Sequence, residues 1–252
     1  MFRIKATTIS YFTRYRRYPA FLYVLFIHTL LFILLLEPNF YIKISSKLNN
    51  GLGVTFSEYA RASIATMLRR QEANVSPNSV YFIGDSMVQG FNTNRLSPPT
   101  INLGIGHDRI SHVAARLKTY QNVRGSKSLL ISVGVNDLRN KSVAESIREY
   151  EKLISQNHNV SQILVIGVLP IDSKLLGLHL KQKISTFNHK LQDMASTYPN
   201  VNYIKPPSQL FTNTKDLVAT LHIGDGLHLN SAGYEIWIHE LQGTLNDLIE
   251  GK

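Results

Sequence analysis

From Ser79 onward, short apolar runs alternate with longer stretches in which apolar residues recur at helical spacing. Apolar runs of this length, bounded by turn residues, predict buried strands. Strands that alternate with helices specify an α/β sandwich with a mostly parallel sheet and right-handed crossovers. We therefore expect one α/β domain over 79–252. The strand candidates are 79–84, 100–104, 128–134, 162–170 and 201–206.

The segments between these runs carry helix signals. Ser142 and Glu145 form a capping box, which marks the start of a helix. Apolar residues recur at helical spacing in the segments, so each helix is expected to bury one face against the sheet. The stretch 171–180 fits either a lid or ordinary helix packing. The helix candidates are 108–121, 142–157, 178–197 and the segment from Ser231 onward.

An uncharged run from Tyr18 to Leu36 precedes the domain. A helix over this run would be about 28 Å long, close to the thickness of a bilayer's hydrocarbon core. Residues 1–17 are basic, and basic flanks stay cytoplasmic. The rival interpretation is a cleaved signal peptide, but the following sequence lacks a small-x-small cleavage pattern. The run therefore predicts a transmembrane anchor over 18–36, with the N-terminus cytoplasmic and the α/β domain on the periplasmic side of a bacterial inner membrane.

The remaining organisation follows from these two features. Residues 1–17 form a basic cytoplasmic arm, and residues 37–78 form a juxtamembrane spacer with one helix from Ser57 to about Gln71. The net charge of +10, from 27 basic and 17 acidic residues, first suggests nucleic acid or an anionic surface. Half of this excess lies in the first twenty residues, and the other basic residues are scattered. We therefore expect no nucleic-acid partner.

Polar and glycine residues stand where the predicted strands end. In open parallel sheets, sites gather at the carboxyl ends of the strands. The first strand ends in Gly-Asp-Ser at 84–86, the second in Asn-Leu-Gly at 102–104, and the third in Gly-Val-Asn-Asp at 134–137. An Asp-Gly-Leu-His block follows at 225–228. These four blocks predict one site built from serine, glycine, asparagine, aspartate and histidine.

Three of these residues fit the requirements of acyl transfer, which needs a nucleophile, a base and a group that orients the base. Ser86 follows a strand and a Gly-Asp turn, which exposes its hydroxyl at the start of the next helix. His228 is the expected base, and Asp225 lies three residues earlier, placed to orient it. His222, the nearest competitor, has Ala219 at the corresponding position. Asp85 and Asp137 are expected to shape loops.

The four blocks resemble those of the SGNH (GDSL-type) hydrolase superfamily over about 79–252. The resemblance implies a flavodoxin-like three-layer α/β/α fold and a Ser-His-Asp triad at Ser86, Asp225 and His228 that acts on esters. It also implies an oxyanion hole formed by the backbone N–H groups of Ser86 and Gly104 and the side-chain amide of Asn136. Many relatives carry a small residue where this chain has His107, a departure that bears on substrate shape.

Several other chemistries have no signature in the sequence. With zero cysteines there is no disulfide, thiolate metal site or cysteine nucleophile. The G-x-S-x-G elbow of α/β-hydrolases, the H-E-x-x-H zinc motif and the Walker A pattern are all absent. The expected site therefore needs neither a metal nor a cofactor.

The sequence predicts a membrane-anchored carboxylic ester hydrolase that removes acyl groups, including acetyl groups, from a lipid or glycan through an acyl-enzyme. One alternative is an O-acyltransferase that passes the acyl group to an envelope polysaccharide with the same triad. The other is a catalytically silent binding module of an envelope complex.

Overall fold

A computed structural model describes residues 18–36, 56–76 and 79–250. The chain divides into two compact units, residues 1–60 and 61–252. The first unit holds helix α2 (Tyr18–Leu36) and the start of helix α4 (Phe56–Ala73). The predicted basic arm at 1–17 and much of the predicted spacer, at 37–55 and 77–78, lie outside the described residues.

The predicted membrane anchor is contradicted. Within the described ranges, no helix combines the length and the apolar character needed to cross a bilayer. The predictions of a transmembrane helix over 18–36, a cytoplasmic N-terminus and a domain facing the periplasm are therefore wrong. They rested on counting uncharged residues, and an uncharged run does not by itself establish a spanning helix.

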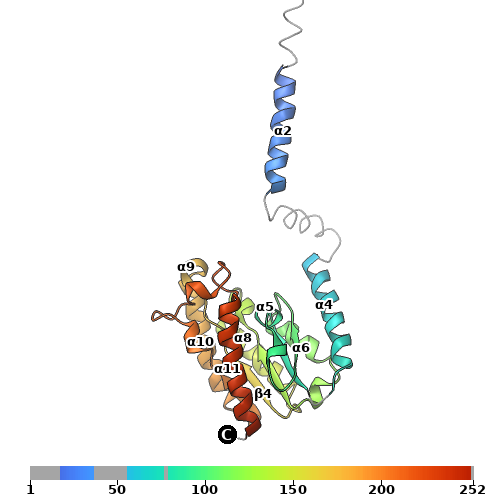
Figure 1. The fold of residues 1–252 in the computed structure, drawn as a ribbon, viewed down its shortest axis with the longest axis vertical. Helices are drawn as coiled ribbons and strands as arrows, with labels where there is room; N and C mark the ends of the chain where they lie inside the picture. The colour runs from blue at the N-terminus through green and yellow to red at the C-terminus, as the bar shows by residue number, and fades with distance from the viewer. Residues whose placement is uncertain (1–17, 37–55, 77–78, 251–252) are drawn as a thin grey trace, which may run out of the picture. The chain divides into compact units, whose positions relative to one another are not determined.

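The second unit is built on a five-stranded sheet in the order β2-β1-β3-β4-β5, and every neighbouring pair is parallel (Figure 1). The register places Gly84 beside both Gly104 and Ser132, so three strands end side by side. The predicted α/β class and mostly parallel sheet are confirmed. The strands are β1 (Val80–Gly84), β2 (Thr100–Gly104), β3 (Ser128–Ser132), β4 (Ile163–Ile166) and β5 (Val201–Ile204).

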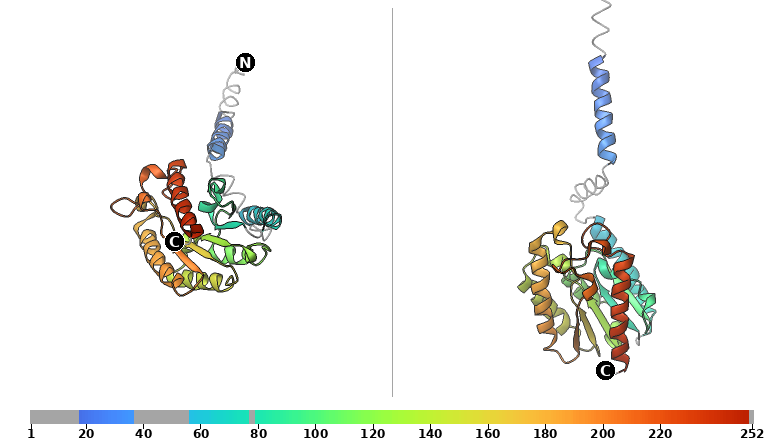
Figure 2. Two further views of the ribbon diagram at one scale, coloured as in Figure 1. Left: turned by 60° about the horizontal axis from the view of Figure 1, so that its bottom comes forward. Right: turned by 60° about the vertical axis from the view of Figure 1, so that its left-hand side comes forward.

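Helices cover both faces of the sheet (Figure 2). One face carries α6 (Ile110–Leu117), α8 (Val143–Ser155) and α10 (Leu178–Ala195), and the other carries α5 (Ser86–Gln89) and α11 (Ser231–Glu250). Each predicted helix over 108–197 forms within its expected range, and Ser142 and Glu145 make the capping box of α8. The short elements are α7 (Val135–Leu138), α9 (Ser173–Leu176), η1 (Thr93–Arg95), η2 (Val123–Gly125), η3 (Ser208–Leu210) and η4 (Ala219–Leu221).

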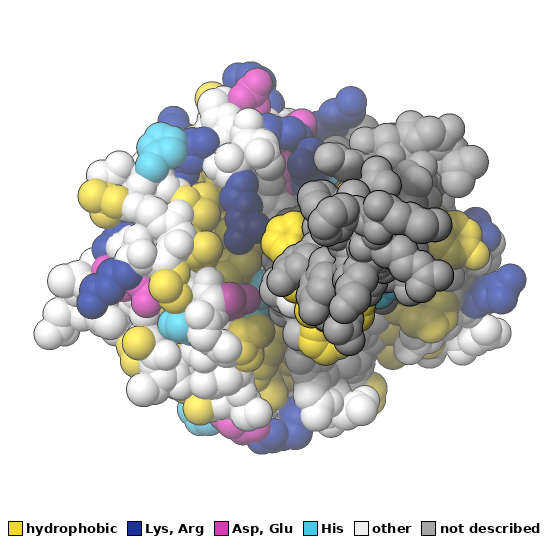
Figure 3. All heavy atoms as spheres, turned by 90° about the horizontal axis from the view of Figure 1, so that it is seen from above, with side chains coloured by type: hydrophobic (Ala, Val, Ile, Leu, Met, Phe, Trp, Pro, Cys, Tyr) yellow, Lys and Arg dark blue, Asp and Glu magenta, His cyan; other side chains and the backbone are white. Residues whose placement is uncertain are grey.

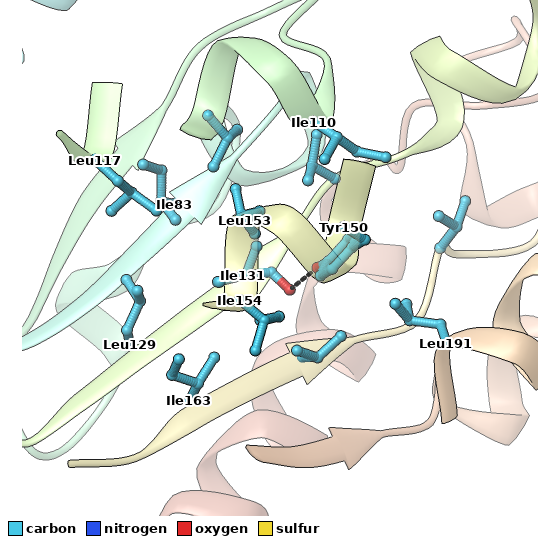
Figure 4. Close-up of a cluster of buried hydrophobic side chains, with 14 of the residues drawn as sticks. Ile83, Ile110, Leu117, Leu129, Ile131, Tyr150, Leu153, Ile154, Ile163 and Leu191 are labelled. Carbon is cyan, nitrogen blue, oxygen red and sulfur yellow. Dashed lines mark hydrogen bonds between the residues drawn. The ribbon is translucent and has the colours of Figure 1, made fainter. Parts of the chain in front are cut away.

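Successive residues of a strand pack into two separate apolar cores, one on each face of the sheet. Tyr81 and Ile83 of β1 pack under α6, α8 and α10, whereas Val80 and Phe82 pack against α5 and α11. Figure 4 shows the first core, where strand side chains meet Tyr150 of α8. Burial of both faces explains why the strands are continuous apolar runs rather than alternating ones.

From Arg61 onward, helix α4 belongs to the second unit. Leu68 is buried in the first core, and the fully buried carboxylate of Glu72 accepts the backbone N–H groups of Gln121, Asn122 and Val123. The carboxylate thereby satisfies backbone donors at the turn before β3. The predicted domain start at residue 79 stays a prediction.

Candidate active site

The nucleophile candidate lies in a tight turn at the carboxyl end of β1. A Cβ on Gly84 would lie 2.0 Å from the carbonyl oxygen of Ser132, so the strand end requires glycine. Asp85 caps helix α5, because its carboxylate accepts the N–H of Met87 at 3.0 Å. Burial raises the pKa of Asp85 to about 7. Ser86 follows as the first residue of α5 and is half-buried.

Ser86, His228 and Asp225 form one hydrogen-bonded chain. The Oγ of Ser86 lies 2.9 Å from Nε2 of His228, and Nδ1 of His228 lies 2.5 Å from Oδ2 of Asp225. A carboxylate on Nδ1 keeps the proton there and leaves Nε2 free to accept the serine proton. Ser86 and His228 are 142 positions apart in the sequence, and the structure brings them together with Asp225.

Local hydrogen bonds orient Asp225. Its Oδ1 accepts the backbone N–H groups of Leu227 at 3.0 Å and His228 at 2.9 Å. Burial alone would raise the pKa of Asp225, but the hydrogen bonds from the His228 ring and from these N–H groups outweigh it and lower the pKa. Asp225 is therefore ionised as it faces the histidine.

The competing histidine has a different role. His222 is buried, and its Nδ1 accepts the N–H groups of Gly224 at 3.0 Å and Gly226 at 3.2 Å. It makes no hydrogen bond to Ser86. His222 is therefore part of the loop that carries Asp225, not the partner of the serine.

The predicted oxyanion donors differ in availability. The N–H of Ser86 has no hydrogen-bond partner in the described part of the chain, whereas the N–H of Gly104 donates to Oδ1 of Asn102 at 2.8 Å. The amide of Asn136, half-buried on α7, donates to the carbonyl oxygen of Asp108 at 3.1 Å. An amide nitrogen carries two protons, so Asn136 keeps a second donor. Gly104 instead permits close packing, since a Cβ there would lie 2.2 Å from the backbone nitrogen of Gln89.

The turn after β2 lies next to the nucleophile. A Cβ on Gly106 would lie 3.9 Å from Cβ of Ser86, so this turn borders the nucleophile. His107, the next residue, is exposed and has the left-handed φ of 63°, which is rare for a residue other than glycine. Among the described residues, its N–H has no hydrogen-bond partner. Sequence analysis had assigned significance to the His107 side chain rather than to this N–H.

A buried ion pair, which sequence analysis missed, ties the strand ends together. Arg116 donates to Oδ2 of Asp108 at 2.7 Å and to the carbonyl oxygens of Leu103 at 2.9 Å and Gly84 at 3.4 Å. Asp108 is also the residue whose carbonyl holds Asn136. The pair therefore links the ends of β1 and β2 with the Asn136 loop. An arginine on the apolar face of a predicted helix was the signal available in the sequence.

Asp137 supports the same loop. It is fully buried, its Oδ2 accepts the N–H of Ile110 at 3.0 Å, and its Oδ1 lies 3.2 Å from Nζ of Lys141. These contacts give it the loop-shaping role that the sequence suggests.

On the face seen in Figure 3, Lys and Arg side chains are spread among neutral and hydrophobic ones.

The chain belongs to the GDSL-like lipase/acylhydrolase family, whose model matches residues 82–236. No curated protein matches this chain.

Solved structures share the fold. A Streptococcus pneumoniae protein whose name refers to platelet activating factor is 24% identical, with 73% of this chain and 92% of that chain covered and a TM-score of 0.65. A GDSL-like lipase from Bacteroides thetaiotaomicron is 15% identical, with 73% and 98% covered and a TM-score of 0.63. An acetylxylan esterase from Geobacillus stearothermophilus is 15% identical, with 66% and 93% covered and a TM-score of 0.54.

Proposed function

We propose that this protein is a serine esterase that hydrolyses acyl esters, including acetyl esters, of a lipid or glycan. The observation that carries the proposal is the 2.9 Å contact between Oγ of Ser86 and Nε2 of His228, with Asp225 on the other ring nitrogen. The family to which the chain belongs, and the acetylxylan esterase of similar fold, support an ester as substrate.

In the first step, His228 takes the proton of Ser86 as its oxygen attacks the ester carbonyl. The proton then passes from Nε2 to the leaving alcohol as the carbon–oxygen bond breaks, which leaves an acyl-enzyme. Asp225 stabilises the imidazolium and holds the ring orientation. In the second step, His228 takes a proton from a water molecule as the water oxygen attacks the acyl carbonyl. The bond between the acyl carbon and Oγ of Ser86 then breaks, and Nε2 returns the proton to Oγ, which releases the acid and restores Ser86.

Negative charge on the carbonyl oxygen requires donors near Ser86. The free N–H of Ser86 and the second amide proton of Asn136 supply two. The N–H of His107 supplies the third, because the N–H of Gly104 is occupied by Asn102. In this proposal the backbone of His107 replaces Gly104 in the predicted oxyanion hole.

The side chains of His228 and Asp225 are 36% and 40% exposed, so water can reach the triad and accept the acyl group. The aligned triad argues against a silent binding module.

Hydrolysis of p-nitrophenyl acetate by the full chain tests the proposal, with Ser86→Ala as the matched variant. We expect turnover by the wild type and a loss of about 10³-fold or more in the variant. No turnover by folded wild-type protein would overturn the proposal. Faster acyl transfer to an added glycan than to water would instead establish the transferase.

A further inference from the structure

A cavity of about 680 Å³ lies between α10, the end of β5 and the loop that follows it. None of the triad residues lines it. Ile171, which does, is followed by Asp172, whose N–H donates at 2.8 Å to the carbonyl oxygen of Gly226 in the triad loop. The cavity therefore adjoins the loop that carries Asp225 and His228.

The lining is basic and contains no carboxylate. Lys181, Lys205 and Lys215 contribute to it, together with His189. Lys181 is neutralised by Asp216 at 2.7 Å, but Lys205 and Lys215 have no carboxylate partner within the described ranges. Two uncompensated ammonium groups at one cavity favour an anionic ligand.

The backbone at Lys215 is held by a hydrogen-bonded turn. Its φ of 62° is left-handed, a conformation that residues with a Cβ rarely adopt. A hydrogen-bonded turn maintains it, since the N–H of Lys215 donates to the carbonyl oxygen of Thr212 at 2.9 Å and the N–H of Asp216 to Oγ1 of Thr212 at 3.0 Å. Its ammonium lies 5.9 Å from the centre of the Phe211 ring. Such maintained strain is typical of functional sites.

The rest of the lining combines apolar walls with hydrogen-bonding groups. Phe211 and Tyr203 offer aromatic rings on which a sugar face can stack, and amide and hydroxyl side chains offer hydrogen bonds that sugar hydroxyls can make and an acyl chain cannot. We propose that the cavity binds an acidic oligosaccharide through carboxylates at Lys205 and Lys215. Its assignment as the glycan part of the substrate rests on the proposed function. The polar lining residues are Gln182, Ser185, Asn188, Gln192, Ser208 and Thr214.

Calorimetric titration of the full chain with tetragalacturonate, with neutral xylotetraose as the comparison, tests this proposal. We expect saturable binding of the acidic sugar that weakens with salt and falls at least about tenfold in the Lys205→Ala/Lys215→Ala variant. Lys190→Ala, on α10 but outside the lining, is the matched control and should bind normally. No binding, equal binding of xylotetraose, or normal binding by the double variant would overturn the proposal.

The control variant Lys190→Ala should hydrolyse p-nitrophenyl acetate at the wild-type rate, and binding of the sugar is measured separately from turnover. If the wild type shows no turnover, the proposed esterase activity is refuted. The calorimetric titration still shows whether the cavity binds the acidic sugar.

A second inference rests on the contacts of His222. Its side chain is 5% exposed, and its Nδ1 faces the N–H groups of Gly224 and Gly226, whose φ values are 103° and 75°. A nitrogen that accepts from two donors carries no proton, so the proton of the neutral ring lies on Nε2. That atom has no hydrogen-bond partner in the described part of the chain and lies 3.8 Å from Oδ2 of Asp172.

We infer that His222 is a positioning residue, which sets the loop geometry that aims Asp225 and His228 at Ser86. The inference rests on the proposed function. Asparagine is the conservative replacement because its Oδ1 is as many bonds from the backbone as Nδ1. Leucine fills similar space without an acceptor and leaves two N–H groups unpaired.

Kinetics of His222→Asn and His222→Leu separate positioning from simple packing. We expect His222→Asn to keep kcat within about threefold of the wild type, and His222→Leu to lose at least tenfold in kcat with KM little changed. In proton NMR, the downfield Nδ1–H resonance of His228 should persist in the asparagine variant and shift or broaden in the leucine variant. Equal kcat values in the two variants, or an unchanged resonance in His222→Leu, would overturn the inference. If the wild type shows no turnover, the Nδ1–H resonance of His228 still tests whether His222 positions the loop.

Discussion

The two halves of the candidate site are held in different ways. The nucleophile half comes from three adjacent strand ends, where Gly84 and Gly104 permit close packing and Asp85 is 3% exposed. The base half is a loop whose Asp225 and His228 side chains are 40% and 36% exposed. The first half is therefore fixed by the register of the sheet, and the second by hydrogen bonds within a few residues.

The electrostatics of the two halves differ in the same way. Burial raises the pKa of Asp85 to about 7, whereas hydrogen bonds from His228 and the backbone overcome partial burial and lower that of Asp225. Substitutions in the base half should therefore change catalysis more than stability, and substitutions in the nucleophile half should change both.

The largest catalytic effect is expected in the base half. His228→Gln removes the general base but alters only a half-exposed side chain, so kcat should fall by about 10³-fold or more while Tm stays within about 4 °C. Steady-state kinetics and a thermal melt measure the two quantities. A large fall in Tm would show that this half is also part of the core.

The next effect concerns the oxyanion donors. Asn136→Ala should lower kcat by about 10²- to 10³-fold because one donor to the developing charge is lost. Asn140→Ala, at an exposed position beyond the same short helix, is the control and should leave kcat unchanged. Equal kcat values in these two variants would remove Asn136 from the proposed oxyanion hole.

The pH dependence of stability sharpens the contrast between the carboxylates. Asp85 is neutral in the folded state up to about pH 7 but ionises near pH 4 when unfolded, so its contribution to stability falls as pH rises through this window. Asp85→Asn keeps an acceptor for the Met87 N–H. Relative to the wild type, this variant should gain on the order of 4 kcal/mol at most between pH 4 and pH 8.

Asp225→Asn provides the comparison in the other half. Because its pKa is lowered, Asp225 stabilises the fold above its usual pKa and loses that contribution as pH falls. Denaturant unfolding at several pH values measures both variants. For each variant, the quantity compared is its free energy of unfolding minus that of the wild type. If this difference changes with pH in the same direction for Asp85→Asn and Asp225→Asn, the contrast between the buried and the exposed carboxylate is contradicted.

The smallest effect is expected at the turn after β2, which borders Ser86. His107→Gly keeps the backbone N–H and relieves a left-handed φ, so kcat should stay within about threefold and the free energy of unfolding should change by no more than about 1 kcal/mol. A tenfold loss of kcat toward p-nitrophenyl acetate would mean that the His107 side chain, rather than its N–H, acts in the site.

The same contrast explains what the sequence can predict. The strands β1, β3 and β4 are the most readily predicted because their residues are buried on both faces and form apolar runs. Asp225 and His228 are recognisable as a pair because they are three residues apart. The contact between Asn102 and Gly104 and the pair Asp108–Arg116 are not, because they depend on side-chain directions at strand ends. The uncharged run does form a helix, α2, but among the described residues no helix meets the length and apolar character needed to cross a membrane, so the predicted anchor is wrong.

Ser86 is the proposed nucleophile, activated by His228, and covalent labelling reports its reactivity. An alkyl fluorophosphonate should form one phosphorus–oxygen bond with Oγ of Ser86 and release fluoride. Mass spectrometry of the digested full chain should find one label, on the peptide that contains Ser86, and no label in His228→Gln under the same conditions. A label on another residue, or none on folded wild-type protein, would contradict the account.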